Sequence, residues 1–144
     1  RNVIGQGPRY NNPNKDITGV GKEFIIFNYD ALEMYRSVYI CEGALNALTI
    51  GDRGIATMGK VVSKYQLNEL IKAPCQRYII LLDFDAQKYA IELALKLIQY
   101  KKVKLVLFED NRDVNDLGRK AVLKKVYETR YATYQGLIKL KNSL

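Results

Sequence analysis

The sequence contains no histidine, and this absence argues against several classes of active site. Ser-His-Asp and Cys-His catalytic groups, histidine zinc sites and the iron facial triad all require an imidazole. Only two cysteines are present, Cys41 and Cys75, and they do not form a C-x-x-C pair. A disulfide framework and a thiolate zinc site are therefore disfavoured, and a reducing cytoplasm is the expected location. Any metal ion that the chain binds must be held by oxygen ligands.

Long apolar runs and low-complexity tracts are also missing. No stretch approaches the ~20 apolar residues that a membrane-spanning helix requires, so we expect no membrane partner. With 144 residues, 48% of them apolar and 26% charged, the composition is that of one soluble globular domain. The chain begins at Arg1 and no charged-then-apolar leader follows. We therefore expect no secretory signal, and we interpret the chain as a piece of a longer protein.

The net charge of +8 is concentrated at the two ends of the chain. Residues 119–144 hold seven Lys and Arg against one acidic residue, and residues 1–22 hold four against one, whereas residues 23–118 hold 12 against 13. A near-neutral centre with two basic ends suits a polyanionic partner such as nucleic acid. The alternative is that the lysines form only a solvated helix face.

The basic segment 119–144 has the spacing of an amphipathic helix. We expect one apolar stripe, made by Leu123, Tyr127, Tyr131, Tyr134 and Ile138. The lysines that lie largely off this stripe are the candidate contacts to nucleic acid: Lys120, Lys124 and Lys125.

Short apolar runs alternate with helical patterns through the middle of the chain. Four runs are typical of strands buried on both faces: 38–41, 55–58, 78–82 and 103–108. Helical patterns lie between them at 44–50, at 64–71 after a capping box of Ser63 and Gln66, and at about 86–100. This alternation predicts an α/β fold, with a roughly four-stranded parallel sheet and helices on both faces. The opening stretch is mostly loop, followed by a candidate extra strand at 23–29.

Residues 54–61, GIATMGKV, come within one residue of a P-loop. Val61 stands where that motif needs the Ser or Thr whose hydroxyl coordinates magnesium. The four residues between Gly54 and Gly59 are apolar, and they make a better strand than a phosphate cradle. We therefore reject the P-loop and expect no ATPase activity.

Acidic residues follow three of the four predicted strands. Glu42 follows the first strand, Asp83 and Asp85 form a D-x-D after the third, and Asp113 and Asp116 follow the fourth. Because open parallel sheets place ligands at the carboxyl ends of their strands, we expect these carboxylates to converge on a divalent cation. The alternative is that each of them is a helix cap or a turn former.

Taken in order, these blocks resemble the Toprim (topoisomerase-primase) domain, in the form found in bacterial and phage DnaG-type primases. The blocks that carry the resemblance are YICEGALNAL, GIATMGK, IILLDFDAQKYAIELALKL and DVNDL. The resemblance implies a Toprim domain at 36–118, preceded by a lead-in at 1–35 that ends an upstream subdomain of a primase core. A basic helical segment, 119–144, follows.

The resemblance also implies roles for single residues. The catalytic carboxylates, which would also bind Mg²⁺ or Mn²⁺, are Glu42, Asp83 and Asp85, with Asp113 and Asp116 as further metal ligands. The residues implied to contact nucleotide or nucleic acid are Gly43, Lys60 and Asn115. Two departures stand out: Asn46 replaces an aspartate of many primases, and AQK at 86–88 replaces an acidic residue and a glycine. Fewer carboxylates imply one firmly held metal ion or a weakened second site.

The implied function is that of the catalytic part of a DNA primase. Such an enzyme makes RNA primers from ribonucleotides on single-stranded DNA by metal-dependent nucleotidyl transfer. A replicative helicase or helicase domain is the expected partner, because the chain has no unwinding module of its own. Three alternatives remain: a Toprim-type nuclease, a fragment of a topoisomerase and a non-catalytic module that only binds nucleic acid.

Overall fold

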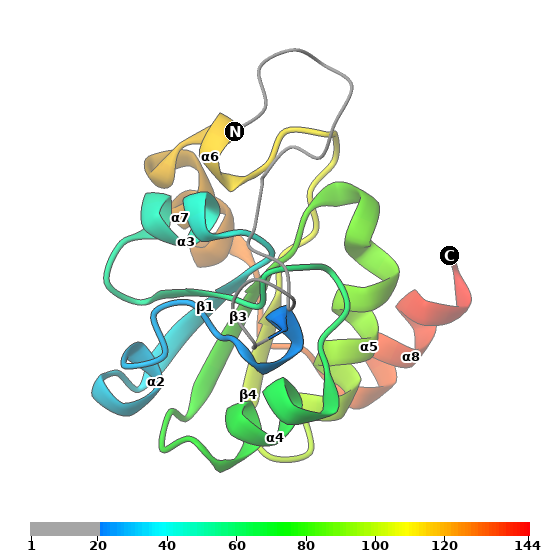
Figure 1. Cartoon of the computed structure of the whole chain (residues 1–144). Helices are drawn as coiled ribbons and strands as arrows, with labels where there is room; N and C mark the ends of the chain where they lie inside the picture. The colour runs from blue at the N-terminus through cyan, green and yellow to red at the C-terminus, as the bar shows by residue number, and fades with distance from the viewer. Residues whose placement is uncertain (1–20) are drawn as a thin grey trace.

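The computed structural model of the chain describes residues 21–144 (Figure 1). Predictions on residues 1–20, which make up most of the lead-in, lie outside the described residues. Four strands form one parallel sheet: β1 (Ser37–Cys41), β2 (Gly54–Ala56), β3 (Arg77–Leu81) and β4 (Lys102–Leu105). Their order across the sheet is β2-β1-β3-β4. The predicted α/β fold with a four-stranded parallel sheet is confirmed, although β4 ends three residues earlier than its apolar run.

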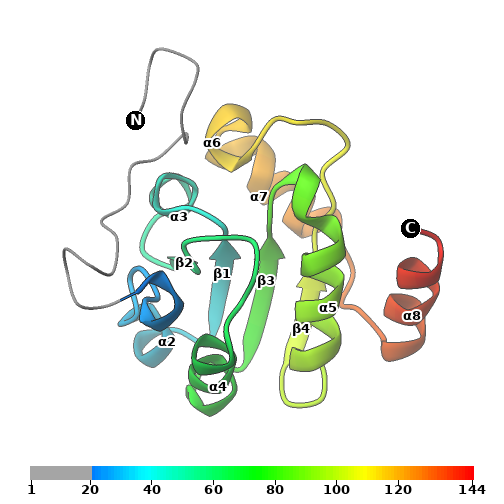
Figure 2. The ribbon, with the colours of Figure 1, turned by 45° about the vertical axis from the view of Figure 1, so that its right-hand side comes forward.

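Helices occupy the connections between the strands and cover both faces of the sheet (Figures 1 and 2). The α-helices are α2 (Ala31–Met34), α3 (Ala44–Ile50), α4 (Lys64–Lys72), α5 (Gln87–Leu97), α6 (Val114–Leu117), α7 (Arg119–Glu128) and α8 (Tyr134–Asn142). Two short 3₁₀ helices, η1 (Lys22–Phe24) and η2 (Phe84–Ala86), complete the described elements. No helix within residues 21–144 has the length and apolar character needed to cross a membrane.

The sheet separates two hydrophobic cores, because successive side chains of a strand point to opposite faces. Val38 and Ile40 of β1 pack into the first core with residues of α4 and α5, and α8 packs on the outside of α5. Cys41, at the end of the same strand, packs into the second core with residues of α3, α6 and α7. Burial on both sides explains why the strands are near-continuous apolar runs.

Helix α4 begins as the sequence predicts, and one of its residues also holds the segment before the sheet. The capping box is present, with the Ser63 hydroxyl accepting from the Gln66 N–H and the Gln66 side chain accepting from the Ser63 N–H. Gln66 is only 1% exposed, and its Nε2 donates to the carbonyls of Lys22, Ile25 and Thr57 at 3.2, 2.7 and 2.8 Å. A buried amide that satisfies these carbonyls fixes residues 22–25 beside the end of β2.

The prediction of an extra strand at 23–29 is wrong. Residues 22–24 form η1, and Phe27 makes a single antiparallel bridge to Ala56. The chain turns away at Asn28, which has a φ of 56° and whose side chain donates to the carbonyls of Asp52 and Gly54. Asparagine tolerates this left-handed conformation, so a turn replaces the continuing strand that the apolar run favours.

The prediction of one apolar stripe along residues 119–144 is also wrong. The segment forms two helices, and the residues that it buries are Val122, Val126 and Leu137, whereas Tyr127 is 88% exposed. The two helices are separated at 129–133, where the N–H of Ala132 donates to the carbonyl of Val103 on β4. This contact satisfies part of the open edge of the sheet, which interrupts the helix and changes which side chains face the core.

Candidate metal centre

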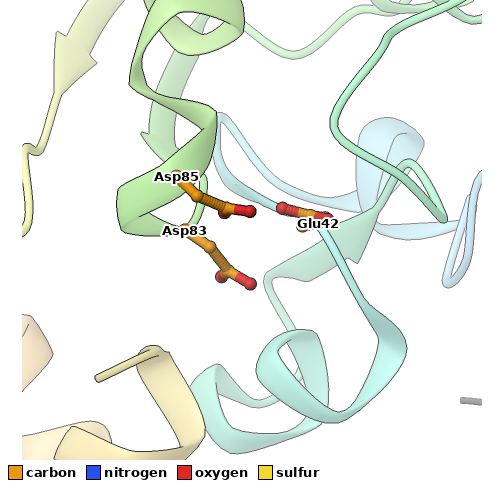
Figure 3. A group of neighbouring side chains, drawn as sticks. All are labelled: Glu42, Asp83 and Asp85. Atoms are coloured by element: carbon orange, nitrogen blue, oxygen red, sulfur yellow. The ribbon is translucent and has the colours of Figure 1, made fainter. Parts of the chain in front are cut away.

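Three carboxylates meet at the carboxyl edge of the sheet, above β1 and β3 (Figure 3). Glu42 directly follows β1, while Asp83 and Asp85 follow β3, which is hydrogen bonded to β1 with Cys41 opposite Leu81. One oxygen from each carboxylate lies within 4.8 Å of the other two. Figure 3 shows the three side chains extending into the same space. Parallel pairing of neighbouring strands therefore brings together residues that are 41 and 43 positions apart in the sequence.

The environment of Glu42 fits a bound cation. Its Oε2 atom is buried and has no hydrogen-bond partner within the described part of the chain. Burial, followed by the charges of Asp83 and Asp85, raises the pKa of Glu42 from 4.5 to about 7, while Lys60 and Lys22 oppose the shift. A buried carboxylate oxygen beside like charges is unfavourable unless a cation compensates it. Oxygen ligands of this kind suit Mg²⁺ or Mn²⁺.

Neither Asp83 nor Asp85 acts as a helix cap. Asp83 stands at the N-cap position of η2 without a side-chain capping bond, and Asp85 lies within η2. Helix α5 begins after Ala86, also without a side-chain cap. Asp83 is instead contacted by the amide of Asn46, whose Nδ2 donates to Asp83 Oδ1 at 3.2 Å. The capping alternative therefore does not explain the D-x-D.

Asp113 and Asp116, in contrast, do cap a helix. Asp113 is 2% exposed, and its Oδ1 accepts from the Asp116 N–H at 2.8 Å, while Asp116 Oδ2 accepts from the Asp113 N–H at 3.2 Å. This reciprocal capping box starts α6. The group of converging carboxylates in residues 21–144 does not include either residue. Their predicted role as metal ligands stays a prediction.

The structure places the three predicted nucleotide contacts around this centre. Gly43 is the N-cap residue of α3, directly after Glu42. Lys60 follows a turn in which Met58 has a φ of 62° and Thr57 Oγ1 donates to the Gly59 carbonyl. The Nζ atom of Lys60 lies 3.7 Å from Asp85 Oδ2. Asn115 is bound to α3, because its side-chain oxygen accepts from the Thr49 hydroxyl at 3.0 Å.

The other predicted contacts, the three lysines of α7, lie beyond α6 on the second face of the sheet. Lys120 and Lys124 are exposed. Lys125 is partly buried, and its Nζ lies 3.7 Å from Glu109 Oε1. Lys120 and Lys124 are thus exposed to solvent, and neither takes part in an ion pair among the described residues.

Two residues of the centre were not identified as functional candidates from the sequence. Asn46 was recognised only as a departure from a resemblance, and its buried amide links Asp83 to the backbone N–H of Asn115. Lys22, held near Gly59 by the bonds of Gln66, acts electrostatically on Glu42. No local spacing relates Lys22 to the carboxylates, since the contact depends on how the segment before the sheet folds back.

The arrangement defines a class of protein: an α/β domain with an acidic centre at the carboxyl edge of a parallel sheet, flanked by lysines. Solved structures that are similar to this fold include primases. The chain is similar to the DnaG primase catalytic domain bound to ssDNA, with 19% identity, a TM-score of 0.71 and coverage of 98% of this chain and 48% of that chain. It is also similar to the E. coli primase catalytic core, with 18% identity, a TM-score of 0.70 and coverage of 97% and 49%.

A third similar structure is that of the Aquifex aeolicus primase, comprising its zinc-binding and RNA polymerase domains. Here the identity is 20%, the TM-score is 0.67, and 92% of this chain and 36% of that chain are covered. The chain thus spans between about a third and a half of the length of these primases. No model of a known protein family matches the chain, and no curated protein is significantly similar to it in sequence. The likeness establishes that the chain has the fold of part of a DnaG primase core.

Proposed function

We propose that the chain is the catalytic Toprim part of a DNA primase, with the Toprim domain at residues 36–118. The observation that carries the proposal is the convergence of Glu42, Asp83 and Asp85, together with the buried Oε2 of Glu42, which has no hydrogen-bond partner among residues 21–144. The fold shared with DnaG primase cores supports it. The substrates are ribonucleotides and a single-stranded DNA template, and the product is a short RNA primer.

In this proposal each residue around the centre has a defined task. Glu42, Asp83 and Asp85 hold Mg²⁺ or Mn²⁺, which when bound supplies the charge that activates the attacking 3′ hydroxyl and stabilises the departing pyrophosphate. Lys60 binds a phosphate of the incoming nucleotide, and its position 3.7 Å from Asp85 supports this role. Asp113 and Asp116, by capping α6, hold Asn115 in place beside α3.

The proposal also includes the partners of the chain and its location in the cell. Single-stranded DNA is the expected partner, and a neighbouring primase structure was solved with ssDNA bound. A replicative helicase or helicase domain is the further partner that we propose, because priming requires an unwound template. Cys41 and Cys75 are free and buried, which agrees with the reducing cytoplasm as the location.

One assay separates primase from nuclease. Incubating the protein with single-stranded DNA, Mg²⁺ or Mn²⁺ and labelled ribonucleotides is expected to yield labelled RNA primers. Shortened DNA without labelled RNA would instead assign the same carboxylates to a Toprim-type nuclease. DNA binding with neither product would leave the non-catalytic module as the better description.

The metal assignment has its own test, in which Asp83→Asn and Glu42→Gln remove one charge each at nearly constant shape. We expect Mn²⁺ affinity to fall by at least about tenfold in each variant and primer synthesis to fall with it. The melting temperature without metal should hold or rise, because repulsion among the carboxylates is relieved. Calorimetric Mn²⁺ titration and thermal melts provide the measurements.

Asp52→Asn is the matched control for this test. Asp52 precedes β2 and therefore lies at the opposite end of the sheet from the three carboxylates. Its substitution also removes one negative charge, and Mn²⁺ affinity should stay unchanged. Equal Mn²⁺ binding by the wild type, Asp83→Asn and Glu42→Gln would contradict the metal centre.

A further inference from the structure

Asn46 lies between the acidic centre and α6, and both ends of its side-chain amide are hydrogen bonded. The residue belongs to α3 and is 3% exposed. Its Nδ2 donates to Asp83 Oδ1 at 3.2 Å, and its Oδ1 accepts the N–H of Asn115 at 3.1 Å. Because a backbone N–H can only donate, the oxygen of the amide must face Asn115 and the NH₂ group must face Asp83. The orientation of the amide is therefore fixed by the backbone.

This orientation closes one side of Asp83 to a metal ion. The NH₂ group presents hydrogen atoms and a partial positive charge to Asp83 Oδ1, and it has no lone pair to offer a cation. Mg²⁺ and Mn²⁺ prefer oxygen ligands, so neither has a favourable position between Asn46 and Asp83. The oxygen atoms that could share a cation are those that Asp83, Glu42 and Asp85 bring within 4.8 Å of one another.

The positive charges near the centre also act against a second cation. The ammonium of Lys60 lies 3.7 Å from Asp85, and Lys22 acts electrostatically on Glu42. Because like charges repel, both lysines disfavour a second divalent ion beside the first.

We propose that Asn46 is a positioning residue that orients Asp83 and limits this centre to a single divalent cation. The inference rests on the metal centre of the proposed function. An aspartate at position 46 would keep an oxygen to accept the N–H of Asn115, so the contact with α6 would survive. It would, however, replace the donor that faces Asp83 by a fourth carboxylate, which gives a second cation the ligands that the wild type withholds.

The test is the number of Mn²⁺ ions bound per chain, measured by titration calorimetry and by the electron paramagnetic resonance spectrum of bound Mn²⁺. We expect one ion for the wild type and two for Asn46→Asp, whose spectrum should be broadened by coupling between neighbouring ions. Asn46→Ala should still bind one ion, but about tenfold more weakly, because Asp83 is no longer held. Thr49→Val is the matched control: it removes the neighbouring bond from α3 to Asn115, leaves Asp83 untouched, and should bind one ion with unchanged affinity.

The outcomes distinguish this inference from the metal centre itself. Two ions in the wild type would overturn the inference and leave the metal centre standing, whereas no bound ion would overturn both. One ion in both the wild type and Asn46→Asp would show that Asn46 does not set the number. If Asn46→Asp does not fold, Asn46→Ala decides, and wild-type affinity in that variant would overturn the positioning role. Because affinity is measured on folded protein, a residue that only stabilises the fold would not change it.

Discussion

The surroundings of Glu42 are unfavourable without a ligand. This residue carries a buried oxygen that lacks a hydrogen-bond partner among the described residues, and it faces two further carboxylates. Burial, followed by the charges of Asp83 and Asp85, raises the pKa of Glu42 to about 7. Near neutral pH the empty centre therefore holds a proton on Glu42 in a large fraction of molecules, and a cation must displace that proton to bind.

The affinity for Mn²⁺ should consequently depend on pH around the pKa of Glu42. With a pKa of about 7, the carboxyl is mostly protonated at pH 6 and mostly ionised at pH 8, so affinity should rise roughly tenfold across this interval. The rise should level off at higher pH. Titration calorimetry at several pH values, in buffers with different enthalpies of ionisation, measures both the affinity and the proton released.

Glu42→Gln provides the control for this pH dependence, since a glutamine has no proton to release. Its residual Mn²⁺ binding should be weaker and should no longer change between pH 6 and pH 8. The stability of the metal-free protein provides an independent measurement. Because folding raises the pKa of Glu42 above 4.5, the contribution of this residue to stability is largest below pH 4.5 and is lost as the pH rises through about 7. A wild-type affinity that is flat between pH 6 and pH 8 would contradict the role of Glu42 as the titrating ligand.

At the scale of elements, β2 and α3 are packed so closely that only glycine fits at one position. A Cβ atom added to Gly54 would collide with the backbone carbonyl of Ala47 in α3. At Gly59, the other glycine of the sequence that resembles a P-loop, an added Cβ would meet, among residues 21–144, only Lys22 Nζ, at an ordinary distance of 3.6 Å. Gly54 therefore serves the contact between a strand and a helix, and this explains why it is a glycine without invoking a phosphate cradle.

Replacing these two glycines by alanine should have unequal effects. Gly54→Ala should destabilise the fold by roughly 2–3 kcal/mol, because the clash is with backbone and the helix or strand must move. Gly59→Ala should change stability by no more than about 0.5 kcal/mol, since its φ is not in the left-handed region and an added Cβ makes only an ordinary contact with the described residues. Urea unfolding of both variants measures the difference. Equal stability of the two variants would contradict the close packing of α3 on β2.

At the scale of the whole molecule, the acidic centre lies at one edge of the sheet and the α7 lysines lie on one of its faces. Lys120 and Lys124 are exposed, and no described ion pair neutralises either of them. Such positive groups attract a phosphate backbone without reading its sequence. We propose that the single-stranded DNA template contacts α7 while the ribonucleotides react at the metal centre.

The triple substitution of Lys120, Lys124 and Lys125 by alanine tests this interaction. If all three lysines bind phosphates, affinity for single-stranded DNA should fall, and the log-log salt slope should decrease by ~0.7 for each phosphate that is no longer bound, or ~2 in total. A charge-matched control is Lys64, Lys72 and Lys96 to alanine, which removes three exposed lysines from α4 and α5 on the other face of the sheet. Fluorescence anisotropy at several salt concentrations measures both variants. The same affinity and slope in the α7 variant as in the wild type would rule out this surface.

The sequence by itself determined most of the strands and helices, and it determined that the site lies at the carboxyl ends of the strands. Buried strands require continuous apolar runs, so 38–41 and 78–82 predicted β1 and β3 to within a residue at each end. Ser63 and Gln66 predicted the start of α4, because a capping box is a local arrangement of four residues. Acidic residues directly after apolar strands then predicted a group of carboxylates at one end of the sheet, since the carboxyl ends of parallel strands lie on the same side.

Only the tertiary structure decided which carboxylates converge and what surrounds them. The strand order β2-β1-β3-β4 puts Glu42 beside Asp83 and Asp85, while Asp113 and Asp116 bond to each other's backbone instead. Local periodicity could not predict the break at 129–133 or the turn at Asn28 either, because both depend on bonds to strands far away in the sequence. The same holds for the amide of Asn46, whose orientation is set by Asn115, a residue 69 positions further along the chain. Patterns within a few residues fix elements, whereas contacts across the chain fix the site.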